Sequence, residues 1–371
     1  MDYQTDEKLK EITACLLGDS KVQHLFTKYQ DETIPLLEHH GLSALIYENQ
    51  DLNRTVPNIN PVALKKAKSH IAMAVANESL KFSECTKIIN SLTVEGLEDY
   101  VIFKGWALAY SVYTKPWLRP RTDIDILVEQ SQVARYHEFL ITNGFTREFA
   151  IEGDLISYQS GYSKALSRHS VIYIDLHWQV SNRQCIAGVF EVNGIISRAQ
   201  KIKHSVANFI IPSQVDSMLL ACQHRLGHHH SEERLIWLYD IYLLAKSFSE
   251  KDWSDFLIKT EELKLANLNY DALTKIQRLF SAQVPEEVTK KLNQLCKQNE
   301  PSAIFLNRRL SNWQILRSDI SSINGFCNKL RFLRQSAFPS GDYIKQRMAT
   351  KSVSWGYVKR MYLGLYRLFG N

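Results

Sequence analysis

The sequence has few of the features that mark secreted, membrane-spanning or zinc-stabilised proteins. No run of about 18 or more apolar residues occurs, so we expect no transmembrane helix. The opening residues MDYQTDEKLKEI lack a basic segment followed by an apolar one, so we expect no signal peptide. The six cysteines are scattered and none forms a CxxC pair, which favours buried free thiols over disulfides or a zinc site. Together these absences predict a cytoplasmic protein.

Negative charge is scarce in the last fifth of the chain. Residues 301–371 contain twelve Lys and Arg against two Asp and Glu, a balance of +10, whereas the whole chain has a net charge of +6. Such asymmetry is typical of a surface for an anionic partner, either nucleic acid or a membrane. A basic face that contacts only solvent explains it equally well. The aromatic and basic helix predicted at Trp355–Phe369 likewise suits membrane binding, RNA stacking or docking on the protein itself.

The apolar pattern divides the chain into three regions. Residues 1–94 are predicted to be helical, 95–211 to form a small α/β core, and 212–371 to be helical with a basic tail. Within the core, strands are predicted at 100–103, 124–128 and 171–177 and helices at 106–113 and 131–143, while 150–170 shows no clear pattern. Outside the core, helices are predicted from Pro61 to about Leu92, from Pro212 with Ser213 as N-cap, and at Leu235–Ala245, Trp253–Leu265, Tyr270–Ser281, Glu286–Cys296, Ala303–Leu316 and Trp355–Phe369. The fold class is therefore α+β, with a mixed sheet flanked by helices.

Two aspartates occur two residues apart in the second predicted strand. Because side chains alternate along a strand, Asp123 and Asp125 share one face, and Ile124 and Ile126 point to the other. Neighbouring carboxylates repel each other unless a cation lies between them, and hard oxygen ligands suit Mg²⁺. An isolated D-x-D is a weak signal, and a turn residue followed by an edge-strand charge is the structural alternative.

The third predicted strand supplies another carboxylate. Asp175 alternates with Ile174 and Leu176, so it projects from the polar face, and three carboxylates converge if the two strands are neighbours. We predict Asp123, Asp125 and Asp175 as metal ligands and catalytic residues, with Asp175 as ligand or base on the nucleophile side. His177 shares the face of Asp175, so it can reach the site or be a half-buried structural histidine.

A short basic segment suits the anionic end of such a site. Gly105 permits close backbone approach to a phosphate, and the helix after it offers free N–H groups. Lys104, Arg119 and Arg121 add positive charge. We therefore predict Lys104, Gly105, Arg119, Arg121 and His177 as nucleotide-binding residues.

These pieces resemble a known family. Lys104-Gly105, the run from Arg121 to Val128 (RTDIDILV) and the run from Asp175 to Trp178 (DLHW) are similar to the uncharacterised bacterial nucleotidyltransferases of the polymerase-β-like superfamily. His40-Gly41-Leu42, His224 and the run from Trp237 to Asp240 extend the resemblance over roughly residues 30–250. Where the wider superfamily has Gly-Gly or Gly-Ser, this chain has Lys104-Gly105-Trp106.

The resemblance implies transfer of an NMP from an NTP to an acceptor hydroxyl or phosphate, with release of pyrophosphate and Mg²⁺ or Mn²⁺ as cofactor. It does not imply an acceptor, and RNA, a protein side chain and a small molecule all remain open. The alternatives are a catalytically inactive scaffold that keeps the fold and a protein bound peripherally to a membrane through its C-terminal helix. His224 and His228–His230 also suggest zinc, but a polar loop between two helices explains them better, with Asp240 bracing the helix pair through His224 or Arg234.

Overall fold

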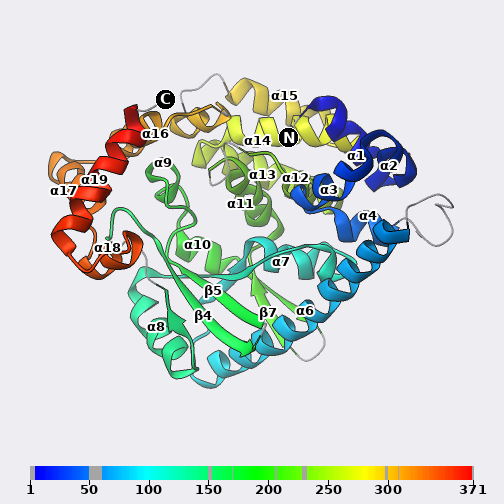
Figure 1. Ribbon diagram of the computed structural model, residues 1–371. Helices are drawn as coiled ribbons and strands as arrows, with labels where there is room; N and C mark the ends of the chain where they lie inside the picture. The colour runs from blue at the N-terminus through cyan, green and yellow to red at the C-terminus, as the bar shows by residue number, and fades with distance from the viewer. Residues whose placement is uncertain are drawn as a thin grey trace.

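The computed structural model describes residues 5–49, 61–148, 153–168, 170–204, 207–227, 232–296, 300–307 and 309–369. Helices surround a mixed five-stranded sheet, which confirms the α+β class (Figure 1). Among the described helices, none is long and apolar enough to cross a membrane.

The sheet has the order β1-β2-β5-β4-β3. Its strands are β1 (Tyr100–Phe103), β2 (Asp123–Val128), β3 (Thr146–Arg147), β4 (Gln159–Ser167) and β5 (Ser170–His177). β2 and β5 are parallel, and the other neighbours are antiparallel. The three predicted strands are confirmed, whereas β3, β4 and the separate hairpin of β6 (Gln200–His204) and β7 (Ala207–Ile211) were not predicted. β4 was missed because its sequence QSGYSKALS has little apolar alternation.

One face of the sheet is apolar and covered. Ile124 and Ile126 of β2 and Ile174 of β5 are buried in one cluster with residues of α6 (Pro61–Val94) and α8 (Val133–Thr142). In Figure 1, α6 runs along one side of the sheet and α8 lies near its other end. The strand alternation that places these side chains inward sends the aspartates to the opposite face.

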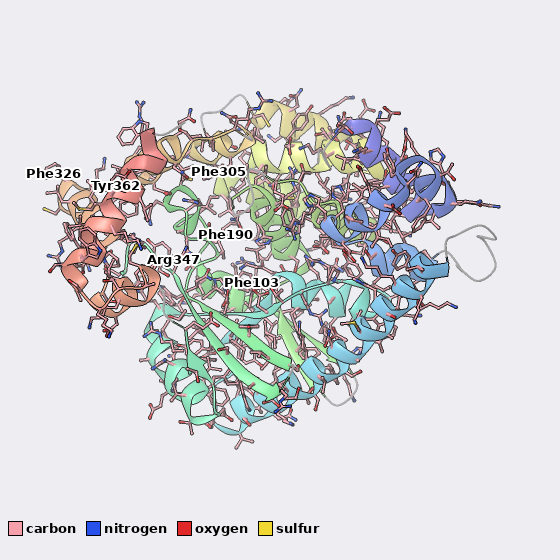
Figure 2. All side chains as sticks on the ribbon, viewed as in Figure 1. Phe103, Phe190, Phe305, Phe326, Arg347 and Tyr362 are labelled. Atoms are coloured by element: carbon pink, nitrogen blue, oxygen red, sulfur yellow. The ribbon has the colours of Figure 1, made fainter. Side chains whose placement is uncertain are left out.

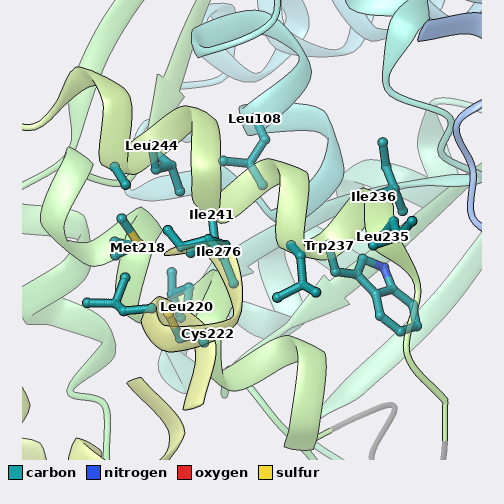
Figure 3. Packing of buried hydrophobic residues seen from close by; sticks show 14 of the residues in the cluster. Leu108, Met218, Leu220, Cys222, Leu235, Ile236, Trp237, Ile241, Leu244 and Ile276 are labelled. Atoms are coloured by element: carbon teal, nitrogen blue, oxygen red, sulfur yellow. The ribbon is translucent and has the colours of Figure 1, made fainter. Parts of the chain in front are cut away.

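The opposite face lies toward a helical layer. Its central helices are α7 (Lys104–Ser111), α9 (Gln184–Ala187), α10 (Val192–Ser197), α11 (Gln214–Gly227), α12 (Leu235–Ser247), α13 (Glu250–Leu263), α14 (Ala266–Phe280) and α15 (Glu286–Leu295). Leu108 of α7 packs in one cluster with Met218 of α11 and Ile241 of α12 (Figure 3). Hydrophobic burial therefore fixes α7, and with it the end of β1, against the helical layer.

The N-terminal helices belong to the same hydrophobic cluster. They are α1 (Asp6–Leu17), α2 (Val22–Tyr29), α3 (Thr33–His39) and α4 (Ser43–Asn49), with the 3-10 turn η1 (Gln30–Glu32). The Ile236 N–H donates to the His40 carbonyl, at 3.2 Å. Gly41 has a φ of 69°, and a side chain there would meet Ile236 and Pro120 at 3.2–3.3 Å. This glycine lets the N-terminal helices pack tightly against α12 and the loop before β2.

The C-terminal segment forms a separate arm at the other end of the helical layer, coloured orange to red in Figure 1. It consists of η4 (Pro301–Leu306), α16 (Asn312–Ser322), α17 (Phe326–Ala337), α18 (Gly341–Arg347) and α19 (Val353–Phe369). The remaining short elements are η2 (Pro116–Leu118) and η3 (Gln130–Gln132). The division at 1–94, 95–211 and 212–371 stays a prediction.

Several sequence expectations need correction. The single helix expected at Ala303–Leu316 is wrong, because η4 ends at Leu306 and α16 begins at Asn312, where Ser311 and Gln314 form a capping box. All six cysteines are free thiols, but Cys327 is exposed and Cys296 partly so. The Ser213 cap is confirmed, since its Oγ accepts from the Asp216 N–H at 3.1 Å. His228–His230 lie outside the described residues.

Candidate metal centre

The parallel pairing of β2 with β5 brings the central aspartates together. Asp125 and Asp175 are direct partners in the register, and Asp123 is the partner of Tyr173. Paired residues of neighbouring strands project to the same face, so all three predicted carboxylates lie on the side away from α6 and α8. The structure thus places the two D-x-D aspartates and the later strand aspartate on one surface, as the alternation predicted.

Asp125 is the most buried of the three, with 5% of its surface exposed. Its Oδ1 accepts a hydrogen bond from Lys104 Nζ at 2.7 Å and lies 2.9 Å from His177 Nε2. Burial by itself raises the pKa of Asp125, but the Lys104 ammonium and the His177 hydrogen bond outweigh it and hold that pKa well below its usual range. Asp125 is therefore a fixed negative charge.

The pKa of Asp175 is shifted in the opposite direction. Burial and the charges of Asp125 and Asp123 raise its pKa from 3.8 to about 7, although the Lys104 ammonium opposes the change. The pKa of Asp123 is also raised, first by burial and then by the charge of Asp125. The negative charge of each carboxylate disfavours ionisation of the other two. A divalent cation stabilises such a site.

His177 is buried, with 1% of its surface exposed, and stacks edge-on against Phe103 at 5.1 Å between ring centroids. Burial and the Lys104 charge lower its pKa to about 4, so the imidazole is neutral near pH 7. A neutral imidazole carries a proton on one ring nitrogen and a lone pair on the other, so Nε2 can coordinate a metal ion when the proton is on Nδ1.

Asp125, Asp175 and His177 each offer a ligand atom, and these three atoms lie within 4.8 Å of one another. Carboxylate oxygen and neutral imidazole are both ligands of divalent metals, so this donor set fits such an ion. It differs from the predicted trio, because Asp123 is not part of this tight group. Sequence reasoning assigned His177 to the nucleotide and not to the metal; its alternation with Asp175 is the signal that could have identified it as a ligand.

Lys104 reaches the carboxylates from the junction of β1 and α7. Its φ of 54° is the left-handed region, which a residue with a side chain seldom adopts. The strained backbone turns the chain into α7 directly after Phe103 and places the ammonium 2.7 Å from Asp125 and 3.4 Å from His177 Nε2. The ammonium supplies positive charge where a metal ion would otherwise be needed.

Gly105 follows at the start of α7. A side chain there would meet the nearest atom, the Arg121 Cβ, at 3.4 Å, which is ordinary contact. Packing alone does not require glycine at this position.

Arg119 and Arg121 are already paired inside the protein. Arg119 donates from Nε and Nη2 to Asp240 at 2.8–3.0 Å, and Tyr113 donates to the same carboxylate. Arg121 contacts Glu78 and donates to the Pro116 and Arg119 carbonyls at 3.0 Å. Its guanidinium lies 4.4 Å from the centre of the Trp106 ring. Asp240 thus braces the loop before β2 through Arg119, rather than through the suggested Arg234, which contacts Glu232.

A series of hydrogen-bonded side-chain amides determines which group donates to the Asp175 carboxylate. The backbone N–H of Tyr158 donates to Asn182 Oδ1 at 2.7 Å, which leaves Asn182 Nδ2 to donate to Gln159 Oε1 at 3.2 Å. Gln159 must then present its Nε2 to Asp175, which it does at 3.1 Å. This relay was not predicted, because β4 lies in the segment without a clear pattern.

Comparison with known proteins identifies the family to which this chain belongs. The model of a family described as uncharacterised nucleotidyltransferases matches residues 28–281, and the chain belongs to that family. This match confirms the resemblance to an uncharacterised nucleotidyltransferase family and identifies the chain as a nucleotidyltransferase-family protein.

Among solved structures, the crystal structure of JHP933 from Helicobacter pylori is 15% identical, with a TM-score of 0.30, over 61% of this chain and 90% of that one. No curated protein matches the sequence.

Proposed function

We propose that the protein transfers an NMP from an NTP to an acceptor hydroxyl or phosphate and releases pyrophosphate, in a reaction that depends on Mg²⁺ or Mn²⁺. Membership of the nucleotidyltransferase family supports the reaction class. The observation that carries the site assignment is the direct pairing of Asp125 with Asp175 on parallel strands, with Asp123 on the same face. The polymerase-β-like core is part of the same proposal.

In this proposal Asp123 and Asp125 hold the metal, and Asp175 and His177 complete its ligand set. A bound divalent ion would polarise the α-phosphate and neutralise the leaving pyrophosphate. Asp175, whose pKa is raised to about 7 in the metal-free protein, is the carboxylate that we propose accepts the proton of an attacking hydroxyl. The relay through Gln159 keeps its carboxylate oriented toward Asp125 while it does so.

Lys104 is the residue proposed to contact the triphosphate directly. Its ammonium is bound to Asp125 in the structure, so an arriving metal ion would compete with it for that carboxylate. Released from Asp125, the ammonium lies at the start of α7, where Gly105 and the free N–H groups also face a phosphate. Because their guanidinium groups are paired elsewhere, we propose that Arg119 and Arg121 support this loop rather than bind the nucleotide.

A labelling experiment tests the proposal. The purified protein is incubated with each α-³²P-labelled NTP, Mg²⁺ or Mn²⁺, and separate RNA, protein and small-molecule fractions. We expect label to be transferred by the wild type, to be lost in Asp125→Asn, and to be retained in Asp255→Asn, an exposed aspartate on α13. Full transfer by Asp125→Asn would refute the site. The fraction that carries the label identifies the acceptor class.

The second candidate is a catalytically inactive scaffold. One observation favours it: the Lys104 ammonium already neutralises Asp125, so the buried site is partly compensated without a metal ion. Metal titration followed by calorimetry separates the two. Binding of Mn²⁺ that disappears in Asp125→Asn supports the enzyme, whereas absence of binding and of label transfer supports the scaffold.

A further inference from the structure

The C-terminal arm exposes an unusual amount of apolar surface. On α17, Phe326, Leu330 and Leu333 are 75%, 51% and 40% exposed. On α19, Trp355, Val358 and Tyr362 are 62%, 52% and 68% exposed. Isolated exposed apolar residues are normal on a protein surface, but a contiguous group indicates an interaction site. We call these six residues the apolar face of the arm.

The residues of each helix form one stripe. Phe326, Leu330 and Leu333 follow the spacing i, i+4, i+7, which places them on one side of a helix with about 3.6 residues per turn. Phe332 is the buried residue of α17 and points to the other side. On α19, the spacing i, i+3, i+7 aligns Trp355, Val358 and Tyr362 in the same way. Each helix therefore packs with one side and leaves an apolar side uncovered.

The two stripes belong to the same arm, and α17 and α19 touch through residues that lie outside the stripes. The Phe338 ring, just after α17, lies edge-on to the Tyr357 ring at 5.7 Å between centroids. Arg360 of α19 donates to the Ser336 carbonyl of α17 at 2.9 Å. In Figure 2, Phe326 is labelled at the outer edge of the arm and Tyr362 is labelled on α19.

Basic residues border the apolar stripes. At about 100° per residue, Lys329 and Arg334 lie on either side of the α17 stripe, and Lys359 lies beside the α19 stripe. Of the two acidic residues in 301–371, Asp319 is buried and paired with Arg183, at 3.2 Å. Asp342 of α18 is the other. The arm therefore presents apolar side chains beside an excess of positive charge, interrupted by the exposed Asp342 and by Asp154, which pairs with Arg331.

We propose that the apolar face of the arm docks on the surface of an anionic lipid bilayer. Aliphatic and aromatic side chains enter the boundary between headgroups and acyl chains, and flanking Lys and Arg bind anionic headgroups. RNA would satisfy the basic residues and the aromatic rings, but it offers Leu330, Leu333 and Val358 no apolar phase to enter. This docking does not depend on the proposed nucleotide chemistry.

The test is co-sedimentation of the full-length protein with vesicles of phosphatidylcholine alone or of phosphatidylcholine mixed with phosphatidylserine. We expect binding to the mixed vesicles, weaker binding as salt screens the headgroup charge, and little binding to phosphatidylcholine. The double variant Leu330→Glu/Leu333→Glu is expected to lose roughly tenfold or more in affinity. The matched control Ile258→Glu, on an equally exposed position of α13, is expected to bind like the wild type.

Circular dichroism and the melting temperature of both variants establish that the arm remains folded. Equal binding by Leu330→Glu/Leu333→Glu and the wild type would overturn the proposal. Binding to RNA without binding to mixed vesicles would overturn it in favour of a nucleic-acid surface. Label transfer from NTP is measured separately, so failure of membrane binding leaves the catalytic proposal untouched.

Discussion

Replacing Asp175 with Asn is expected to stabilise the metal-free protein at alkaline pH and not at acidic pH. Asp175 lies beside Asp125 on the neighbouring strand, and burial together with the charges of Asp125 and Asp123 raises its pKa to about 7. The folded state therefore binds a proton that the unfolded chain, with an ordinary pKa of 3.8, releases at lower pH. Asparagine has a similar shape and never acquires the charge.

The magnitude follows from the two pKa values. A rise from 3.8 to about 7 corresponds to about 4 kcal/mol at about 1.4 kcal/mol for each tenfold change in acidity. Because the side chain is partly exposed, we expect about 2–4 kcal/mol. The wild type loses this stability as pH rises from about 4 to about 7, and the loss is complete above that range. Below about pH 4 both forms are uncharged at this position, and only the change in hydrogen bonding remains.

Thermal unfolding of the wild type and Asp175→Asn between about pH 4.5 and pH 8.5 measures the effect. The difference in melting temperature is expected to grow with pH to on the order of 5 °C. Saturating Mg²⁺ should raise the melting temperature of the wild type and reduce the advantage of the variant, because the ion binds only the folded state. A melting-temperature difference that is independent of pH, or an Asp175→Asn variant less stable at every pH, would refute the reasoning. Asp255→Asn, with an exposed carboxylate, is the control.

Three further predictions follow from the same contacts. Lys104→Met should shift the acidic limb of the pH–rate profile to higher pH, because the ammonium lowers the pKa of both Asp125 and Asp175; an unchanged limb would contradict its placement. Gln159→Ala should shift that limb in the same direction, because it removes a hydrogen-bond donor to Asp175. Asn182→Asp should reproduce the shift, because a carboxylate cannot donate to Gln159. If both variants have the activity and pH profile of the wild type, the relay is excluded. Arg119→Met should lower the free energy of unfolding by about 3–5 kcal/mol, because it leaves the Asp240 carboxylate buried without its arginine partner. The double variant Arg119→Met/Asp240→Leu should recover part of this loss. Denaturant unfolding of both variants measures the two effects.

Local patterns in the sequence predicted most elements near the site. The apolar alternation around Asp123, Asp125 and Asp175 predicted both strands and the face of each side chain, because a strand of period two can bury only one set. Ser213 predicted a helix start because its hydroxyl caps a local N–H. These signals depend on residues within one turn or one strand, so they need no knowledge of the rest of the chain.

Partners far apart in the sequence were decided by the tertiary structure alone. The pairing of β2 with β5 puts Asp125 opposite Asp175, and no local pattern specifies that register. The arginines predicted for the nucleotide proved to be paired internally, because Asp240 and Glu78 come from distant helices. Likewise, the sequence showed a basic C-terminal fifth, but only the packing of α17 on α19 decided which apolar residues stay exposed.

The sequence by itself thus determined which groups share a strand face, because the residue types and their spacing set the alternation of side chains. The tertiary structure decided which of those groups meet and what state each is in. The pKa of an aspartate depends on burial and on charges a few ångströms away, and these neighbours are brought together only by the folded chain.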